Sequence, residues 1–99
     1  MTQQYIAGEL SLRLAQLQAA ATDPERAREL AELRYAAETG SRGALSAVIA
    51  RALALADELC WDALGRGDAP AFSRHAALGR DLWEFGVCAR LLADDPSPR

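Results

Sequence analysis

A long segment near the end of the chain, residues 70–93, places the strongest limit on the fold. At about 100° per residue, its large apolar side chains cover well over half of a helical wheel. These side chains are Phe72, Leu78, Leu82, Trp83, Phe85, Val87, Leu91 and Leu92. A helix that lies on a single core usually shows an apolar stripe of about 100°. The segment is therefore predicted to be a helix that is covered from several sides and against which the other helices pack.

Three further segments show the periodicity of helices: residues 3–21, 24–39 and 44–65. The first follows Thr2, a residue type that often caps helices. The second begins near Thr22 and Glu25, whose spacing fits a capping box, with Pro24 in the first turn. Gly40 marks its end. No segment shows the alternating pattern of a β-strand.

Short loops of roughly two to five residues favour antiparallel packing of neighbouring helices. We therefore predict an all-α fold, a single up-down-up-down four-helix bundle over residues 1–95, with a frayed polar tail at 96–99. If the last two helices form a straight hairpin, Gly79 lies beside Ala56 and Gly86 lies near Ile49. These two helices are then expected to approach each other closely.

The charge and composition exclude several classes of protein. The chain of 99 residues has a formal net charge of −3, and its eleven basic residues are all Arg, which is typical of a GC-rich bacterial coding sequence. It shows no basic stripe that would bind nucleic acid. No apolar run approaches the roughly 18 residues that span a bilayer, and no signal peptide is visible. We expect a cytoplasmic protein that binds neither nucleic acid nor membranes.

The sequence contains no recognisable cofactor or metal motif. Asp57, Glu58 and Asp62 lie on one side of the third helix, but metal sites in helical bundles use Glu-x-x-His motifs, which this chain lacks. Phosphate-binding loops, dinucleotide fingerprints and nucleophile elbows are also missing. We expect no cofactor and no metal, and we interpret the acidic side chains as a solvated face relieved by Arg66.

Cys60 and His75 form one potential nucleophile–base pair, because the hairpin places them at the same level. No third group that would orient the imidazole is evident, so Cys60 is interpreted as a small buried apolar residue. Cys88 lies about thirteen residues, or about 19 Å, further along the hairpin, which is too far for a disulfide. Its place in the polar strip of the last helix predicts that it is more exposed than Cys60.

The first helix has two apolar seams on opposite faces. The seam with the larger side chains is expected to face the core: Ile6, Leu10, Leu14 and Leu17. The second is expected to point outward and to pair with a symmetry mate: Tyr5, Gly8, Leu12, Ala15 and Ala19. Trp61, on the charged side of the third helix, is a further interface residue that would extend this surface.

The predicted function is therefore that of a non-enzymatic protein–protein interaction module that forms a homodimer. A second copy of the chain is the expected partner, and a different protein is the other partner considered. The alternative function is that of a small-molecule binder or minor enzyme. Its pocket would lie between the third and fourth helices, near Cys60, His75 and Trp61.

Overall fold

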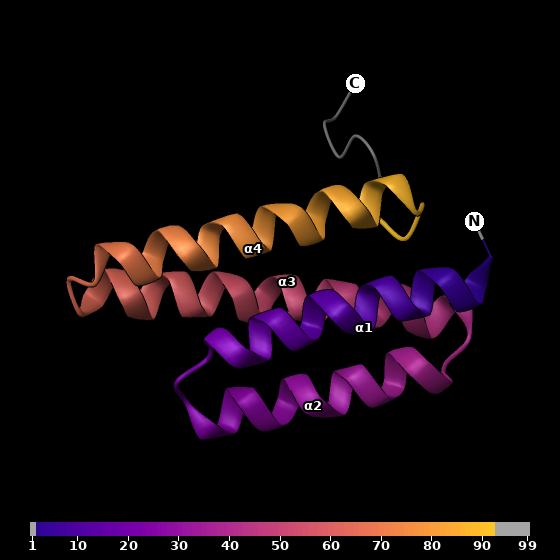
Figure 1. Cartoon of the computed structure of the whole chain (residues 1–99), viewed down its shortest axis with the longest axis horizontal. Coiled ribbons are helices and arrows are strands. Elements are labelled where there is room, and N and C mark those ends of the chain that lie inside the picture. Colours follow the sequence, from indigo (N-terminus) through magenta and orange to yellow (C-terminus); the bar gives the residue numbers. More distant parts are fainter. Residues whose placement is uncertain (1, 93–99) are drawn as a thin grey trace.

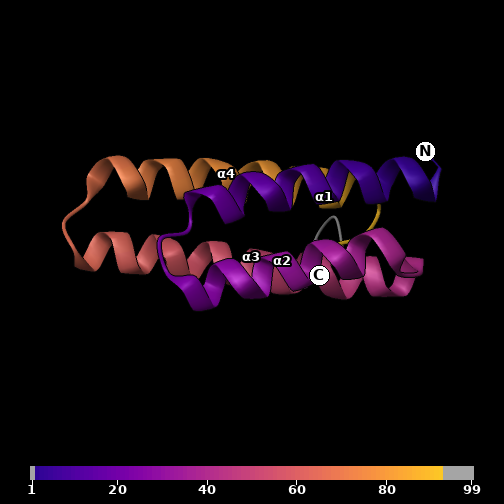
Figure 2. The same cartoon turned by 60° about the horizontal axis from the view of Figure 1, so that its bottom comes forward.

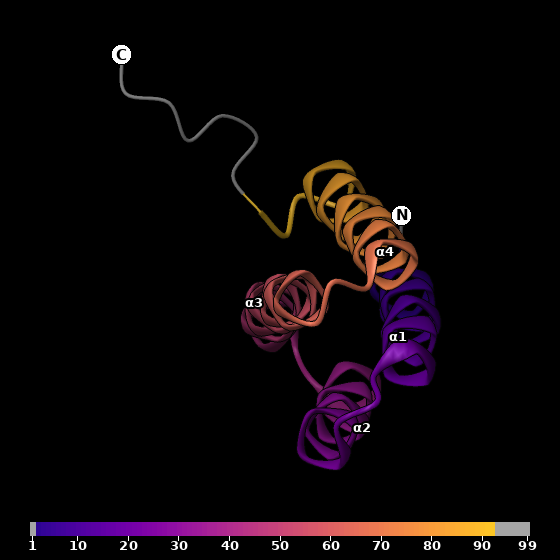
Figure 3. The ribbon, with the colours of Figure 1, turned by 90° about the vertical axis from the view of Figure 1, so that its left-hand side faces the viewer.

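The computed structural model describes residues 2–92 and contains four α-helices in this part of the chain (Figure 1). They are α1 (Gln3–Ala20), α2 (Pro24–Thr39), α3 (Arg42–Gly65) and α4 (Ala69–Cys88). Each helix packs against the next, and α4 packs against α1, so that the four form a ring when viewed along their axes (Figure 3). This arrangement confirms the all-α, up-down-up-down bundle. The predicted tail at residues 96–99 lies outside the described residues.

The helices begin at polar caps that the sequence encodes locally. The Thr2 hydroxyl accepts a hydrogen bond from the backbone N–H of Tyr5, as expected for the cap of α1. The predicted capping box of Thr22 and Glu25 is wrong, because the carboxylate of Asp23 accepts from the Glu25 backbone N–H instead. Asp23 directly precedes the first residue of α2, and it therefore occupies the capping position.

The core lies between the four helices, and both α1 and α3 contact the other three. α3 contacts α1, α2 and α4, whereas α4 contacts only α1 and α3 among the described elements. The expectation that α4 is covered from several sides is therefore wrong, and Phe72 and Trp83 remain exposed on it. The largest fully buried side chains are Ile6, Leu10, Leu14, Leu30, Leu45, Ile49, Leu55 and Leu82. They show that the predicted inner seam of α1 does face the core.

Two glycines set the close approach of α3 and α4. A Cβ atom added at Gly79 would lie 3.3 Å from the Cβ of Ala56, and one added at Gly86 would lie 2.6 Å from Cδ1 of Ile49. The predicted register of the hairpin is therefore confirmed at both positions. Figure 2 shows the two helices running side by side to their common turn, beyond the ends of α1 and α2.

The end of α4 differs from the prediction of a helix that continues to residue 93. The helix ends at Cys88, and Arg90 adopts a left-handed backbone conformation with φ of 62°. The backbone N–H groups of Leu91 and Leu92 then both donate to the carbonyl of Gly86. This turn buries Leu91 against the core. The sequence prediction assumed a straight helix to residue 93 and therefore did not include a turn that brings the chain back toward the core.

The start of α3 contributes to this turn from the other side. α3 begins at Arg42, two residues before its predicted start, and the Ser41 hydroxyl accepts from the backbone N–H of Ala44. The Arg42 guanidinium donates to the carbonyl of Ala89, 2.9 Å away. A cation at a helix C-terminus satisfies carbonyl groups that have no partner within the helix. The first turn of α3 therefore caps the end of α4.

Ion pairs join α2 to α3. Arg26 pairs with Glu58 and Asp62 of α3 and with Asp23 at the start of its own helix. Two of the three acidic residues predicted to form a solvated face are therefore held by a cation of α2. Arg66, which was expected to relieve Asp62, lies 4.0 Å from Asp68 instead. No helix within residues 2–92 has the length and apolar character needed to cross a bilayer.

Candidate functional site

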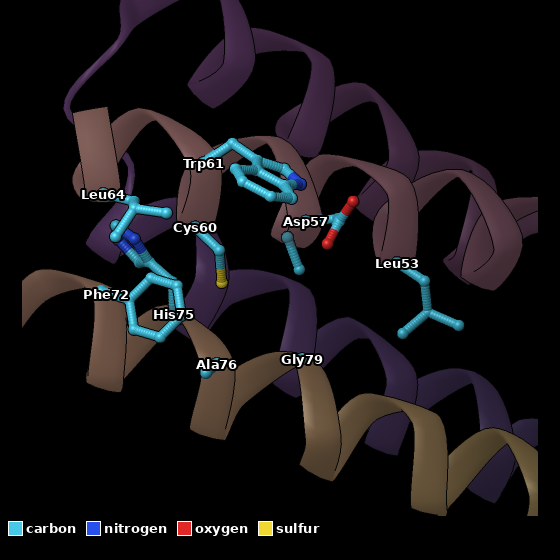
Figure 4. Close-up of a pocket in the computed structure, with 10 residues that line it drawn as sticks. Leu53, Asp57, Cys60, Trp61, Leu64, Phe72, His75, Ala76 and Gly79 are labelled. Atoms are coloured by element: carbon cyan, nitrogen blue, oxygen red, sulfur yellow. The ribbon is translucent and has the colours of Figure 1, made fainter.

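A pocket of about 430 Å³ opens between α3 and α4, on the side of the hairpin that faces away from α1 and α2 (Figure 4). Its volume falls within the range of natural small-molecule sites. It is lined by Leu53, Ala56, Asp57, Cys60, Trp61 and Leu64 of α3 and by Phe72, His75, Ala76 and Gly79 of α4. The space exists because small residues face each other where the two helices meet, while larger side chains stand around them.

The structure brings together the three residues of the alternative function, because Cys60, Trp61 and His75 all line this pocket. Figure 4 shows the Cys60 sulfur directed from α3 toward Ala76 of α4. In this view the imidazole of His75 lies between the side chain of Leu64 and the ring of Phe72. The proximity of Cys60 and His75 follows directly from the hairpin register, which was predicted from a straight antiparallel hairpin about the turn at residues 67–68.

His75 is almost completely buried, with 3% of its surface exposed. Its Nε2 lies 3.3 Å from the carbonyl oxygen of Ala20, at the end of α1. A carbonyl oxygen only accepts hydrogen bonds, so Nε2 carries the proton and Nδ1 of the neutral ring is an acceptor. Nδ1 is buried and has no hydrogen-bond partner among the described residues. A buried acceptor without a partner is uncommon and costs stability.

Cys60 lacks the features of an activated nucleophile. Burial, and to a lesser extent the negative charge of Asp57, raises the pKa of the Cys60 thiol above its ordinary value. The thiol therefore remains protonated at neutral pH, whereas nucleophilic attack requires the thiolate. Because Nδ1 of His75 has no partner and Nε2 is directed at Ala20, the imidazole is not positioned to take the thiol proton.

Asp57 is the one carboxylate among the residues that line the pocket, and no Arg side chain lines it. It forms no ion pair within residues 2–92, unlike its neighbours Glu58 and Asp62. Asp57 and Trp61 lie one helical turn apart, and Figure 4 shows the carboxylate next to the indole ring. The outer rim of a mostly apolar pocket therefore carries, among the described residues, an unpaired negative charge beside an exposed indole ring.

The outer face of α1 carries five of the six residues of the predicted interface. Tyr5 is 55% exposed and Leu12 is 53% exposed, and the smaller residues of this seam are exposed or half-buried. Trp61 is 63% exposed but lies at the rim of the pocket on α3. Figure 3 places α1 and α3 at opposite corners of the bundle, so these six residues do not form one continuous surface.

Sequence reasoning missed several residues of the pocket, namely Leu53, Asp57, Leu64 and Phe72. The signal was present as a second row on each helix. Residues 53, 57, 60 and 64 recur at spacings of four and three, as do residues 72, 76 and 79. Rows with this spacing lie on one helical face. Periodicity alone does not distinguish a buried row from the wall of a groove, so these rows did not reveal the pocket.

No family model, curated protein or solved structure matches this chain. Between residues 2 and 92, no three His, Cys or acidic side chains are grouped so that they could hold a metal ion. Function is therefore inferred from the geometry of the two exposed apolar surfaces, the outer face of α1 and the α3–α4 pocket.

Proposed function

We propose that the protein is a non-enzymatic interaction module that forms a homodimer through the outer face of α1. The observation that supports this proposal is the exposure of Tyr5 and Leu12, which lie seven residues apart on one face of the helix. Gly8 lies between them, and a Cβ added to it would meet no atom within 4 Å. Exposed apolar surface that forms a continuous stripe on a soluble protein often marks a contact site.

The size of this face favours a dimer that depends on concentration. Full burial of a large apolar side chain contributes about 1.5–3 kcal/mol. Roughly half of Tyr5 and of Leu12 is already covered in one chain. Two such side chains from each of two copies therefore contribute about 3–6 kcal/mol when the faces meet. Association costs at least about 4 kcal/mol in lost freedom, so the dimer is expected to be weak and reversible.

Light scattering over a range of protein concentrations tests this proposal. Leu12→Glu should shift the mass toward that of a monomer, because it places a charge in the centre of the face. The matched control is Ala31→Glu, which adds the same charge at an exposed position of α2, outside the proposed face. A wild type that remains monomeric at millimolar concentration contradicts the proposal. A dimer that is unchanged in Leu12→Glu places the contact elsewhere.

A second candidate function, the binding of a small molecule between α3 and α4, is favoured by a specific observation. The pocket combines an apolar lining with a buried His75 acceptor that no group of the protein satisfies. Ligand sites typically have this combination of apolar walls and a few polar groups. The protonated state of Cys60 favours binding over thiol catalysis at this pocket.

A further inference from the structure

The polar groups of the α3–α4 pocket define the chemistry of a ligand that would complement it. Asp57 is an anionic acceptor at the rim, and no Arg side chain lines the pocket. An anionic ligand would therefore meet a like charge without any compensating cation. A positively charged group would meet both the Asp57 carboxylate and the face of Trp61, and aromatic faces attract cations. The rim thus favours an ammonium group over a neutral or negatively charged one.

The second polar group is Nδ1 of His75. The two nitrogens of an imidazole ring point in widely different directions, and Nε2 is directed at Ala20 of α1. Nδ1 is therefore turned away from Ala20, on a side chain that forms part of the pocket wall. The atom itself is covered by neighbouring side chains, so a ligand group contacts it only when the pocket lining shifts. As the acceptor of a neutral ring, it would be satisfied by a ligand hydroxyl or N–H group.

These two acceptors lie at different places in the pocket. Cys60 is three residues after Asp57 on α3, which corresponds to about 4.5 Å along the helix axis. His75 lies across the gap from Cys60, on α4. Between the two acceptors the walls are apolar, with Leu64 and Phe72 at the end near His75. A complementary ligand therefore has a cation at one end, an apolar body, and a hydrogen-bond donor at the other end.

We infer that the pocket binds a small arylalkylamine that carries a hydroxyl or N–H donor on its ring. The ammonium group contacts Asp57 and Trp61, the aromatic body lies between the apolar walls, and the donor reaches Nδ1 of His75. This inference rests on the second candidate function, the binding of a small molecule in this pocket. It does not depend on dimerisation through α1.

Four commercially available probes test the inference by varying the two ends separately. Tyramine carries both the ammonium and the hydroxyl group, 2-phenylethylamine lacks the hydroxyl, and 4-hydroxyphenylethanol lacks the charge. The fourth probe, 3-(4-hydroxyphenyl)propionate, reverses the charge. Binding is measured by NMR titration of the indole N–H signal of Trp61, in a Trp83→Phe background that leaves one indole signal.

Tyramine should bind most tightly. It should bind about two- to fivefold more tightly than 4-hydroxyphenylethanol because of the exposed carboxylate. It should bind about two- to tenfold more tightly than 2-phenylethylamine because of the bond to His75. The propionate should bind most weakly. Asp57→Asn should reduce the advantage of the amine over the alcohol, whereas Glu32→Gln, which removes an exposed acid of α2, should leave it unchanged.

The role of His75 is tested by His75→Phe, in which tyramine and 2-phenylethylamine should bind equally. If this variant does not fold, the ¹⁵N resonance of Nδ1 in the wild type provides the second measurement, and it should shift with tyramine but not with 2-phenylethylamine. Equal binding of amine and alcohol, or tightest binding of the propionate, overturns the inference while the pocket remains a ligand site. If no probe binds, both this inference and the second candidate function are contradicted. Light scattering reports on the α1 dimer independently of either result.

Discussion

Gly86→Ala provides a direct test of how tightly α3 and α4 are packed. An added Cβ would lie 2.5 Å from Cδ1 of Leu92 and 2.6 Å from Cδ1 of Ile49. Carbon atoms in contact are normally separated by about 3.5–4.0 Å, so each overlap is about 1 Å. Leu92 is partly exposed and has room to move, but Ile49 is fully buried among other side chains. The cost of the substitution is therefore set mainly by Ile49.

Two opposing effects determine the result. Overpacking of a well-packed core typically costs about 1–3 kcal/mol. Replacement of Gly by Ala within a helix gains up to about 1 kcal/mol. Gly86→Ala should therefore lower the free energy of unfolding by up to about 2 kcal/mol. Gly8→Ala is the matched control, because its Cβ meets no atom within 4 Å and only the gain applies.

The two variants are compared with the wild type by thermal unfolding followed by circular dichroism, at micromolar concentration to limit self-association. A difference of 1 kcal/mol shifts the midpoint of a domain of this size by about 4–8 °C. Gly86→Ala should therefore melt at least about 4 °C below Gly8→Ala. A Gly86→Ala variant that is as stable as Gly8→Ala would show that the helices do not approach closely at Ile49, and the packing argument would be refuted.

Three further predictions concern single residues. Arg90 has a φ of 62°, a conformation that costs a residue with a side chain about 1 kcal/mol. Arg90→Gly should therefore raise the free energy of unfolding, measured by urea titration, by about 1 kcal/mol. An unchanged or lower free energy would contradict the left-handed turn. Cys88 is exposed, whereas burial raises the pKa of the Cys60 thiol. Iodoacetamide at pH 7.5 should therefore modify the Cys60→Ser variant, which retains Cys88, much faster than the Cys88→Ser variant, which retains Cys60. Equal rates would contradict this difference. The hydrogen bond and charge of Arg51 lower the pKa of Glu29, so their contribution to stability is present above the ordinary pKa of glutamate and is lost as the pH falls through the lowered value. The stability difference between the wild type and Glu29→Gln should therefore be largest near pH 7 and should shrink on acidification; a difference that grows in acid would show the opposite sign.

Much of this fold could be predicted because its signals are local. Thr2 and Gly40 mark the ends of helices through interactions of the backbone with nearby residues, and these interactions do not depend on the rest of the chain. The register of the last two helices was also predictable. Gly79 and Gly86 lack the side chains that would separate the helices, and a hairpin with a short turn leaves few alternative registers.

The candidate site was predictable only in part. Cys60 and His75 were placed together by the same register, and the alternative of a pocket between these helices followed from it. The unpaired Asp57 was not predicted, because Asp57, Glu58 and Asp62 look alike in the sequence. The tertiary structure distinguishes them, since Arg26 of α2 reaches Glu58 and Asp62. Asp57 is left without a partner at the pocket rim among the described residues.

The sequence by itself determined four amphipathic helices, their order and the close contact of the last two. Only the tertiary structure decided that α1 and α3, and not α4, contact all the other helices. It also decided that the chain turns back at Arg90, so that Leu91 covers the core. The physical reason is the same in both cases. Helical periodicity shows which side chains are apolar and lie on one face of a helix. It does not show which neighbouring helix covers that face, because this depends on how all four helices pack together.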